Sequence, residues 1–263
     1  MSNIPPFSGF RVDVSGARAD LVLNQPEKLN PLSTQTLLDI EHAARWIDTQ
    51  RDVRVVVVRG EGRAFCAGAD LDSFTAENFE EYTPQIAGDA GRRMADAVEA
   101  MRAVAIAQIH GHCVGGGLVL AAACDLRVAA DGTRFAIPEV DLGIPLAWGG
   151  IPRLVREIGP ARTKELVMTC RPFFPEEGLA SGFLNRVVDS DQLAASVDDL
   201  AAQVASKPRI AIEATKTATN AVTADMVGVS RAWSDTNSLQ AALHDDEAKT
   251  SRENYVRSVL GGG

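Results

Sequence analysis

The chain of 263 residues has little cysteine and histidine, and it lacks patterns that define several protein classes. Its four cysteines show no CxxC spacing, which predicts reduced thiols in the core of a cytoplasmic protein. His110 and His112 are two residues apart and would point to opposite faces of a strand, with no third histidine or acidic cluster nearby, so we expect no metal site. No stretch approaches the roughly 18 unbroken apolar residues of a membrane span. Neither a basic region nor a long apolar one marks the N-terminus, so we expect no signal peptide.

Excess basic charge is also absent. The net charge of −9 and the pI near 5.0 argue against a nucleic-acid partner, which would need a basic surface. Hydrophobic residues at 46% and charged residues at 23% are ordinary values for a folded protein and exclude wholesale disorder. The length is sufficient for a substantial core, either in one large domain or in a main domain with an appendage.

A triple glycine, Gly115 to Gly117, precedes the small apolar run LVLAAAC. This pattern predicts a tight turn that leads into a buried helix, because glycine adopts positive φ and allows close approach of a ligand. The unpaired N–H groups of a first helical turn favour an anion, or an oxygen that becomes negative during a reaction. Glu139 lies in the same segment, which has few other reactive side chains. We therefore expect an anion-stabilising turn beside a carboxylate.

A second turn of small residues, Ala67-Gly68-Ala69, follows a valine run at 53–58 that predicts a strand buried on both faces. Two such turns could bring two backbone N–H groups to one point, forming an oxyanion hole in which each donor contributes roughly 3 to 4 kcal/mol. The alternative is that small residues only allow a helix to pack closely on a strand. The presence of Glu139 favours the oxyanion hole.

The remaining pattern is that of an α/β protein. Residues 10–24 predict a hairpin, and Ser33 is a candidate cap of a helix with an apolar face. The segment 75–103 is polar and without clear period until helical spacing returns at Met94; Arg92 and Arg93 within it could meet an anion but are more typical of solvated charges. From 210 to 258 nearly every residue is compatible with a helix.

Five segments together resemble the crotonase superfamily, the enoyl-CoA hydratase/isomerase family. They are QPEKLNPLS, VRVVVVRGEGRAFCAGADL, IHGHCVGGGLVLAAACDLRVA, FAIPEVDLGI and RLVREIGPARTKELVMT, in the family's order over nearly the whole chain. The resemblance implies an α/β fold, a spiral of ββα units over residues 1–205, with a C-terminal α-helical region at 206–263 that packs on neighbouring subunits. It implies a homotrimer or dimer of trimers, with an acyl-CoA thioester as substrate and no cofactor besides the coenzyme A that the substrate carries.

The same resemblance assigns roles to individual residues. The N–H groups of Ala69 and Gly116 would hold the thioester oxygen, and Glu139 would be the acid/base. Asp70 is expected to brace its turn rather than to react. The residues expected to bind the substrate are Lys28, Leu29, Ala67, Gly68, Asp70, Leu71 and Gly115.

The chain departs from the hydratases of the family in its acid/base residues. Val119 stands where they carry a first glutamate, and Ala147 stands where a glycine helps to hold the catalytic water. Proton transfer by Glu139 alone therefore favours double-bond isomerisation over hydration, with Asp141 as a weaker acid candidate. Apolar neighbours predict a raised pKa for Glu139. The alternatives are a hydratase with an altered water site and a silent acyl-CoA-binding protein. A dinucleotide-binding fold is disfavoured because the glycines lack GxGxxG order.

Overall fold

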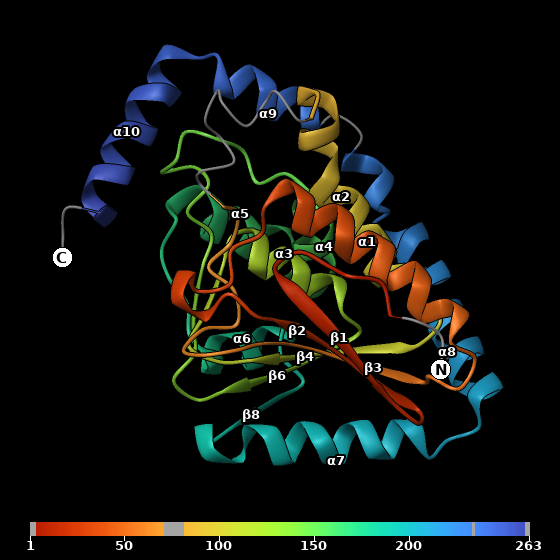
Figure 1. Cartoon of the computed structure of the whole chain (residues 1–263). Coiled ribbons are helices and arrows are strands. Elements are labelled where there is room, and N and C mark those ends of the chain that lie inside the picture. The colour runs from red at the N-terminus through yellow and green to blue at the C-terminus, as the bar shows by residue number, and fades with distance from the viewer. Residues whose placement is uncertain (1–3, 71–81, 233–234, 261–263) are drawn as a thin grey trace.

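The computed structural model describes residues 4–70, 82–232 and 235–260 (Figure 1). Its main sheet has six strands in the order β1-β2-β3-β4-β6-β8. The first two strands form the predicted antiparallel hairpin, and the other neighbouring strands are parallel. The strands are β1 (Phe10–Ser15), β2 (Arg18–Leu23), β3 (Val55–Gly60), β4 (Val104–Ile109), β6 (Leu126–Ala130) and β8 (Arg186–Val188).

Helices cover both faces of this sheet. Val56 and Val58 of β3 face the larger core with α1 (Thr34–Thr49), α2 (Pro84–Ala100) and α3 (Gly116–Ala123). The alternate valines, Val55 and Val57, pack against α7 (Leu193–Ala205), which runs below the sheet in Figure 1. The prediction that the valine run is buried on both faces is confirmed, since all four side chains are fully buried.

A second, smaller sheet brings the loops after the main strands together. It consists of β5 (His112–Val114) and β7 (Arg134–Ala136), which are parallel. Isolated bridges extend it: Cys66 pairs with Cys113, and Leu32 pairs with Ala69. The chain that follows β3 therefore lies beside the strand that leads into α3, which places the two small-residue turns next to each other.

The other helices complete the shell, and the C-terminal region is helical as expected. The helices before it are α4 (Gly150–Ile158), α5 (Pro160–Thr169) and α6 (Pro175–Ser181), and the C-terminal ones are α8 (Arg209–Met226), α9 (Asp235–Leu243) and α10 (Asp246–Leu260). Short 3₁₀ helices are η1 (Pro26–Lys28), η4 (Ser190–Gln192) and η5 (Val229–Ala232). In the described part of the chain, no helix has the length and apolar character needed to cross a bilayer.

The sequence predicted the start of α1 correctly but not the start of α2. Ser33 caps α1 as predicted, since its side chain accepts a hydrogen bond from the N–H of Thr36. Helix α2 begins at Pro84, ten residues before the helical spacing that the sequence indicated at Met94. Thr83 is its cap and proline suits its first turn, so capping chemistry sets this start although the first turns are polar.

Candidate active site

The two small-residue turns meet at Gly68. A Cβ atom on this glycine would lie 2.8 Å from the carbonyl oxygen of Val114 and 3.5 Å from the amide nitrogen of Gly116. Gly68 also has φ +100°, a conformation that disfavours any other residue. Glycine is required here because the two backbones approach each other directly, and this approach brings Ala69 and Gly116 to the same cavity.

The local backbone geometry leaves the N–H groups of Ala69 and Gly116 without a hydrogen-bond partner among the described residues. The N–H of Leu32 donates to the carbonyl of Gly68, and the carbonyl of Leu32 accepts from the N–H of Asp70. The N–H of Ala69, which lies between these two bonds, therefore faces away from Leu32. Gly116 is the first residue of α3, where an N–H group has no partner within the helix. No hydrogen bond joins either N–H to another residue within the described ranges.

Glu139 places its carboxylate against the glycine turn. Its Oε1 lies 2.5 Å from the position that a Cβ atom on Gly115 would occupy, so a side chain at Gly115 would displace it. The Oε2 atom is buried and receives no hydrogen bond from the described residues. Burial, opposed by a hydrogen bond from its own backbone N–H, raises the pKa of Glu139 to about 7. The predicted direction of this shift is confirmed, and the carboxylate is suited to exchanging protons near neutral pH.

The raised pKa of Glu139 is expected to make the stability of the fold depend on pH. Between pH 4.5 and about 7 the folded state holds a proton that the unfolded state has released. The stability gained from this proton is therefore complete below pH 4.5 and is lost as the pH rises through 7. The two pKa values, 4.5 and about 7, correspond to a loss of about 3 kcal/mol.

Glu139→Gln does not titrate and should avoid this loss. Urea unfolding of both proteins at several pH values between 4.5 and 8 measures the effect. We expect the variant to gain about 3 kcal/mol relative to wild type across this range. A difference in unfolding free energy that stays constant with pH would show that the carboxyl group has an ordinary pKa.

The cavity shared by these groups is small and otherwise apolar. Its volume is about 30 Å³, which is enough to hold a water molecule. Among the described residues that line it, Glu139 is the one with an ionisable side chain. Val119, at 1% exposure, and Ala147 are buried walls at the positions where the sequence departs from the hydratases. The other lining residues are Ala69, Gly116, Ile144, Pro145, Leu146, Trp148 and Leu239.

The residues expected to bind substrate lie around the first turn. The N–H of Ala67 donates to the carbonyl of Leu29 at 2.9 Å, which fixes the loop at Lys28 and Leu29 beside the turn. Lys28 itself is exposed at the end of η1. Asp70 lines a neighbouring cavity of about 40 Å³ that also touches Ala69. Leu71 lies outside the described residues.

Asp141 is not a second acid of this site, contrary to the expectation from an extended segment. The chain turns at this point: the N–H of Leu142 donates to the carbonyl of Pro138, and the N–H of Ile144 donates to that of Glu139. The turn leaves Asp141 exposed and away from the cavity lining.

Arg92 and Arg93 are engaged within the protein. Arg92 pairs with Asp89 and Asp96 of its own helix, and Arg93 pairs with Glu41 of α1. Their charges are thus balanced by carboxylates rather than offered to a ligand, and neither lines the cavity of Glu139. Within the described ranges, no group of three His, Cys, Asp or Glu residues is placed to hold a metal ion.

Sequence reasoning missed Trp148 and Leu239, which line both cavities at Ala69. Trp148 has φ +59°, a conformation that is rare for a bulky residue and that no motif in the neighbouring sequence predicts. Leu239 lies in α9, about a hundred residues from Glu139 in sequence. The one available signal was Gly91, a glycine inside a helix, which often marks close packing against that helix.

Comparison with known proteins gives the family of this chain. Residues 15–258 match the family model described as enoyl-CoA hydratase/isomerase. The chain is 34% identical to a crotonyl-CoA hydratase of Syntrophomonas wolfei over 203 residues, and this alignment covers 77% of each protein. It is 31% identical over 207 residues to a peroxisomal Delta(3,5)-Delta(2,4)-dienoyl-CoA isomerase of Arabidopsis thaliana, covering 74% of each.

The fold agrees with solved structures of the same class. An enoyl-CoA hydratase from Mycobacterium avium subsp. paratuberculosis superposes with a TM-score of 0.86 over 95% of this chain and 100% of that one, at 24% identity. The architecture is thus the crotonase fold, as the sequence predicted. The chain belongs to the enoyl-CoA hydratase/isomerase family.

Proposed function

We propose that the protein isomerises the double bond of an enoyl-CoA thioester, with Glu139 as its single acid/base and the N–H groups of Ala69 and Gly116 as its oxyanion hole. The observation that carries this proposal is the shared cavity: Ala69 and Gly116, whose N–H groups have no partner among the described residues, line it together with the buried carboxylate of Glu139, whose pKa is about 7. Coenzyme A enters only as part of the substrate, and the reaction requires no other cofactor.

The proposed reaction needs one carboxylate and a site for negative charge. The ionised Glu139 removes a proton from C2 of a 3-enoyl thioester. The electrons of that C–H bond form a C1–C2 double bond, and the carbonyl electrons move onto the thioester oxygen, which gives a negatively charged dienolate; the C2–C3 double bond forms when C4 is protonated. Two N–H donors stabilise this enolate. Glu139 then returns the proton to C4, which completes the conversion to a 2-enoyl thioester without net consumption of water or base.

Hydration is the second candidate because the crotonyl-CoA hydratase relative carries that activity in its name. Adding water to a 2-enoyl thioester needs a water molecule held between groups that accept and return its protons. Val119 and Ala147 contribute only apolar surface to this cavity, leaving Glu139 to orient the water alone. We therefore expect isomerisation to be faster than hydration.

A panel of thioesters tests the proposed function. Wild-type protein is given 3-enoyl-CoA and 2-enoyl-CoA substrates of equal length, and double-bond migration and water addition are followed in parallel. Conversion of 3-enoyl-CoA at a higher kcat/KM than hydration of 2-enoyl-CoA supports the isomerase. Faster hydration favours the second candidate, and tight binding without either reaction favours a silent acyl-CoA-binding protein.

We also propose that the chain assembles as a homotrimer, alone or as a dimer of trimers, through α8. Its apolar side chains Ile210, Val222 and Met226 are 79%, 61% and 76% exposed. Lys216, which pairs with Asp125, is the one buried residue of this helix. Ala211, Ala214, Ala218 and Ala221 of this helix are likewise exposed. A helix with so little of its apolar surface covered is typical of a subunit interface.

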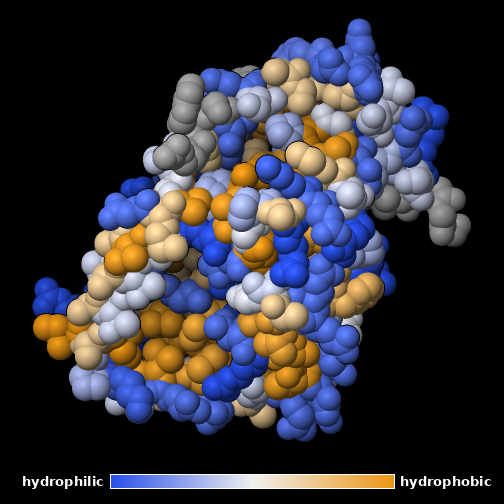
Figure 2. Space-filling model, turned by 180° about the vertical axis from the view of Figure 1, so that it is seen from behind, coloured by the Kyte–Doolittle hydropathy of each residue, from blue (hydrophilic) through white to orange (hydrophobic). Residues whose placement is uncertain are grey.

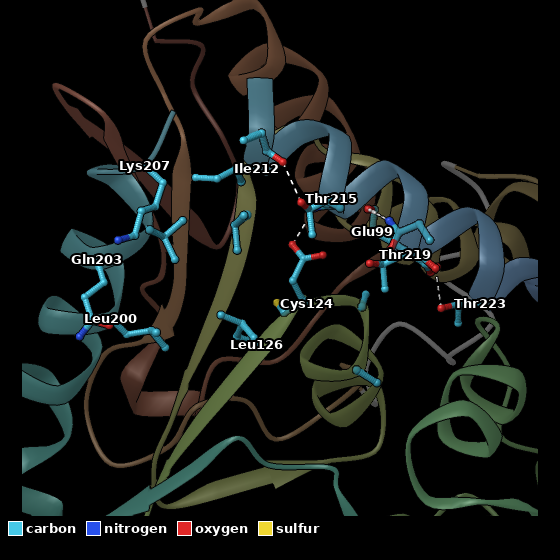
Figure 3. A pocket seen from close by; sticks show the side chains of 18 of the residues that line it. Glu99, Cys124, Leu126, Leu200, Gln203, Lys207, Ile212, Thr215, Thr219 and Thr223 are labelled. Carbon is cyan, nitrogen blue, oxygen red and sulfur yellow. Dashed lines mark hydrogen bonds and ion pairs between the residues drawn. The ribbon is translucent and has the colours of Figure 1, made fainter. Parts of the chain in front are cut away.

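A groove beside α8 adds apolar surface to the same region. It encloses about 740 Å³ between α7 and α8, and Figure 3 shows Leu200 at the left, Ile212 near the top, and Cys124 and Leu126 below Ile212. Apolar side chains also gather in a hollow on the lower half of the face in Figure 2. The groove does not include Glu139, so we assign it to assembly rather than to catalysis.

Charge placed on α8 should separate the subunits. Met226→Lys puts a cation on the exposed apolar face, where association would bury it without a partner. Light scattering after gel filtration should give a mass of at least three 28.0 kDa chains for wild type and a shift towards one chain for the variant. Met168→Lys, at a methionine 67% exposed on α5, is the matched control and should leave trimers intact. A wild-type monomer, or an unchanged mass for Met226→Lys, contradicts this interface.

A further inference from the structure

Trp148 is held in a costly backbone conformation by contacts on both sides. The left-handed conformation of Trp148, with φ +59°, costs roughly 1 to 2 kcal/mol. Arg153, at 0% exposure, donates through Nη1 to the carbonyl oxygens of Trp148 at 3.4 Å and Gly149 at 3.2 Å. The N–H of Gly149 donates to Oδ2 of Asp235 in α9 at 2.8 Å. Strain that surrounding contacts maintain in this way is characteristic of functional sites.

The indole of Trp148 lies against two glycines, one in α2 and one in the proposed oxyanion hole. A Cβ atom on Gly91 would overlap the indole at Cδ2, and one on Gly116 would overlap it at Cζ3. Both contacts require the absence of a side chain. The ring is therefore fixed between α2 and the first turn of α3, directly beside a proposed donor to the thioester oxygen.

This position makes the indole a wall between two small chambers. One chamber holds Glu139 and Gly116, and the other extends past Asp70 towards α1 and α2. Ala69, Trp148 and Leu239 border both chambers, whose volumes are about 30 and 40 Å³. Val119 and Leu146, which are buried core residues, also line the chamber of Glu139. The side chains of Trp148 and Leu239 therefore lie at the boundary between the two chambers.

We propose that Trp148, together with Leu239, is the specificity-determining element of the site and restricts the substrate to short-chain enoyl-CoA thioesters. The inference rests on the proposed function, because it places the thioester oxygen at Ala69 and Gly116. With the oxygen there, the reacting carbons occupy the Glu139 chamber, and each further carbon meets the indole. A longer chain requires the two chambers to join, which removal of the indole achieves.

The test compares chain lengths in turnover and in binding. Turnover is measured with 3-butenoyl-CoA and 3-decenoyl-CoA, and binding with the unreactive butanoyl-CoA and decanoyl-CoA, for wild type and Trp148→Ala. Wild type should prefer the short compounds at least tenfold. Trp148→Ala should shift the long-to-short ratio by at least tenfold towards the long compounds, since each methylene group that becomes buried is worth about fourfold in affinity.

Two further variants make the result decisive. Trp46→Ala removes an indole from α1 that packs on the core but does not line either chamber, and it should leave the ratio unchanged. Trp148→Phe keeps an aromatic ring of smaller size and should give an intermediate ratio, which covers the case that Trp148→Ala fails to fold.

Failure of this inference is distinguishable from failure of the proposed function. If no compound of any length is turned over, the isomerase proposal is lost, but the ratio of butanoyl-CoA to decanoyl-CoA affinity still decides the role of Trp148. Equal wild-type preference for long and short chains, or a ratio that Trp148→Ala and Trp148→Phe leave unchanged, overturns the inference.

Discussion

Glu139→Gln is expected to lower kcat for 3-enoyl-CoA isomerisation by about 10²- to 10⁴-fold, the range for loss of a general acid/base. The amide matches the carboxylate in size, so the glycine turn that surrounds it should keep its shape. It cannot accept the proton from C2 or return one to C4. Binding of butanoyl-CoA should change by no more than a few fold, because the proposed N–H donors are backbone groups that the substitution leaves in place.

The neighbouring acid provides the control for this prediction. Asp141→Asn removes a carboxylate two residues away that is exposed and does not line the cavity. Steady-state rates and butanoyl-CoA affinity are measured for both variants at one pH. Asp141→Asn should retain nearly wild-type kcat. Undiminished turnover by Glu139→Gln, or an equal loss in both variants, would remove Glu139 from the proposed mechanism.

Arg153→Met is expected to destabilise the fold by about 3 to 5 kcal/mol, the usual cost of leaving a buried ion pair without one partner. Arg153 is fully buried and pairs with Asp96 at 2.8 Å and with Glu99 at 2.7 Å. Burial works to raise the pKa of Glu99, but Arg156 and Arg153 outweigh it, so this pKa lies below its ordinary value. Methionine fills part of the space and leaves carboxylate charge uncompensated.

An exposed arginine provides the control, because it shows how much an ion pair on the surface contributes to stability. Arg257 is 75% exposed and lies 3.6 Å from Glu253 one helical turn away, and Arg257→Met should cost about 0.5 kcal/mol or less. Urea unfolding at neutral pH compares the two variants with wild type. If Arg153→Met unfolds at the same urea concentration as Arg257→Met, the buried network does not support α2 and α4 as described.

The parts of the site that sequence reasoning found are those with local signals. Three consecutive glycines have few roles outside a turn with positive φ or a close approach, and Gly115 shows both. An apolar environment could likewise be read from the neighbours of Glu139 along the chain. The hairpin, the valine strand and the cap of α1 were predictable for the same reason, since a few adjacent residues determine each.

The features that sequence reasoning missed depend on contacts between segments that are distant in sequence. Arg153 meets Asp96 and Glu99 across more than fifty residues, and its sequence neighbours give no sign of a buried charge. Trp148 adopts its conformation because Arg153 and Asp235 hold the adjoining backbone. Asp141 was misplaced because alternation applies only to extended chain, whereas hydrogen bonds between nearby backbone groups form a turn there.

A crystal structure of the protein with butanoyl-CoA bound tests the central claim most directly. The account predicts the thioester oxygen at about 2.7 to 3.1 Å from the amide nitrogens of both Ala69 and Gly116, with C2 facing the carboxylate of Glu139. An oxygen bound by other groups, or a C2 atom turned away from Glu139, would contradict it.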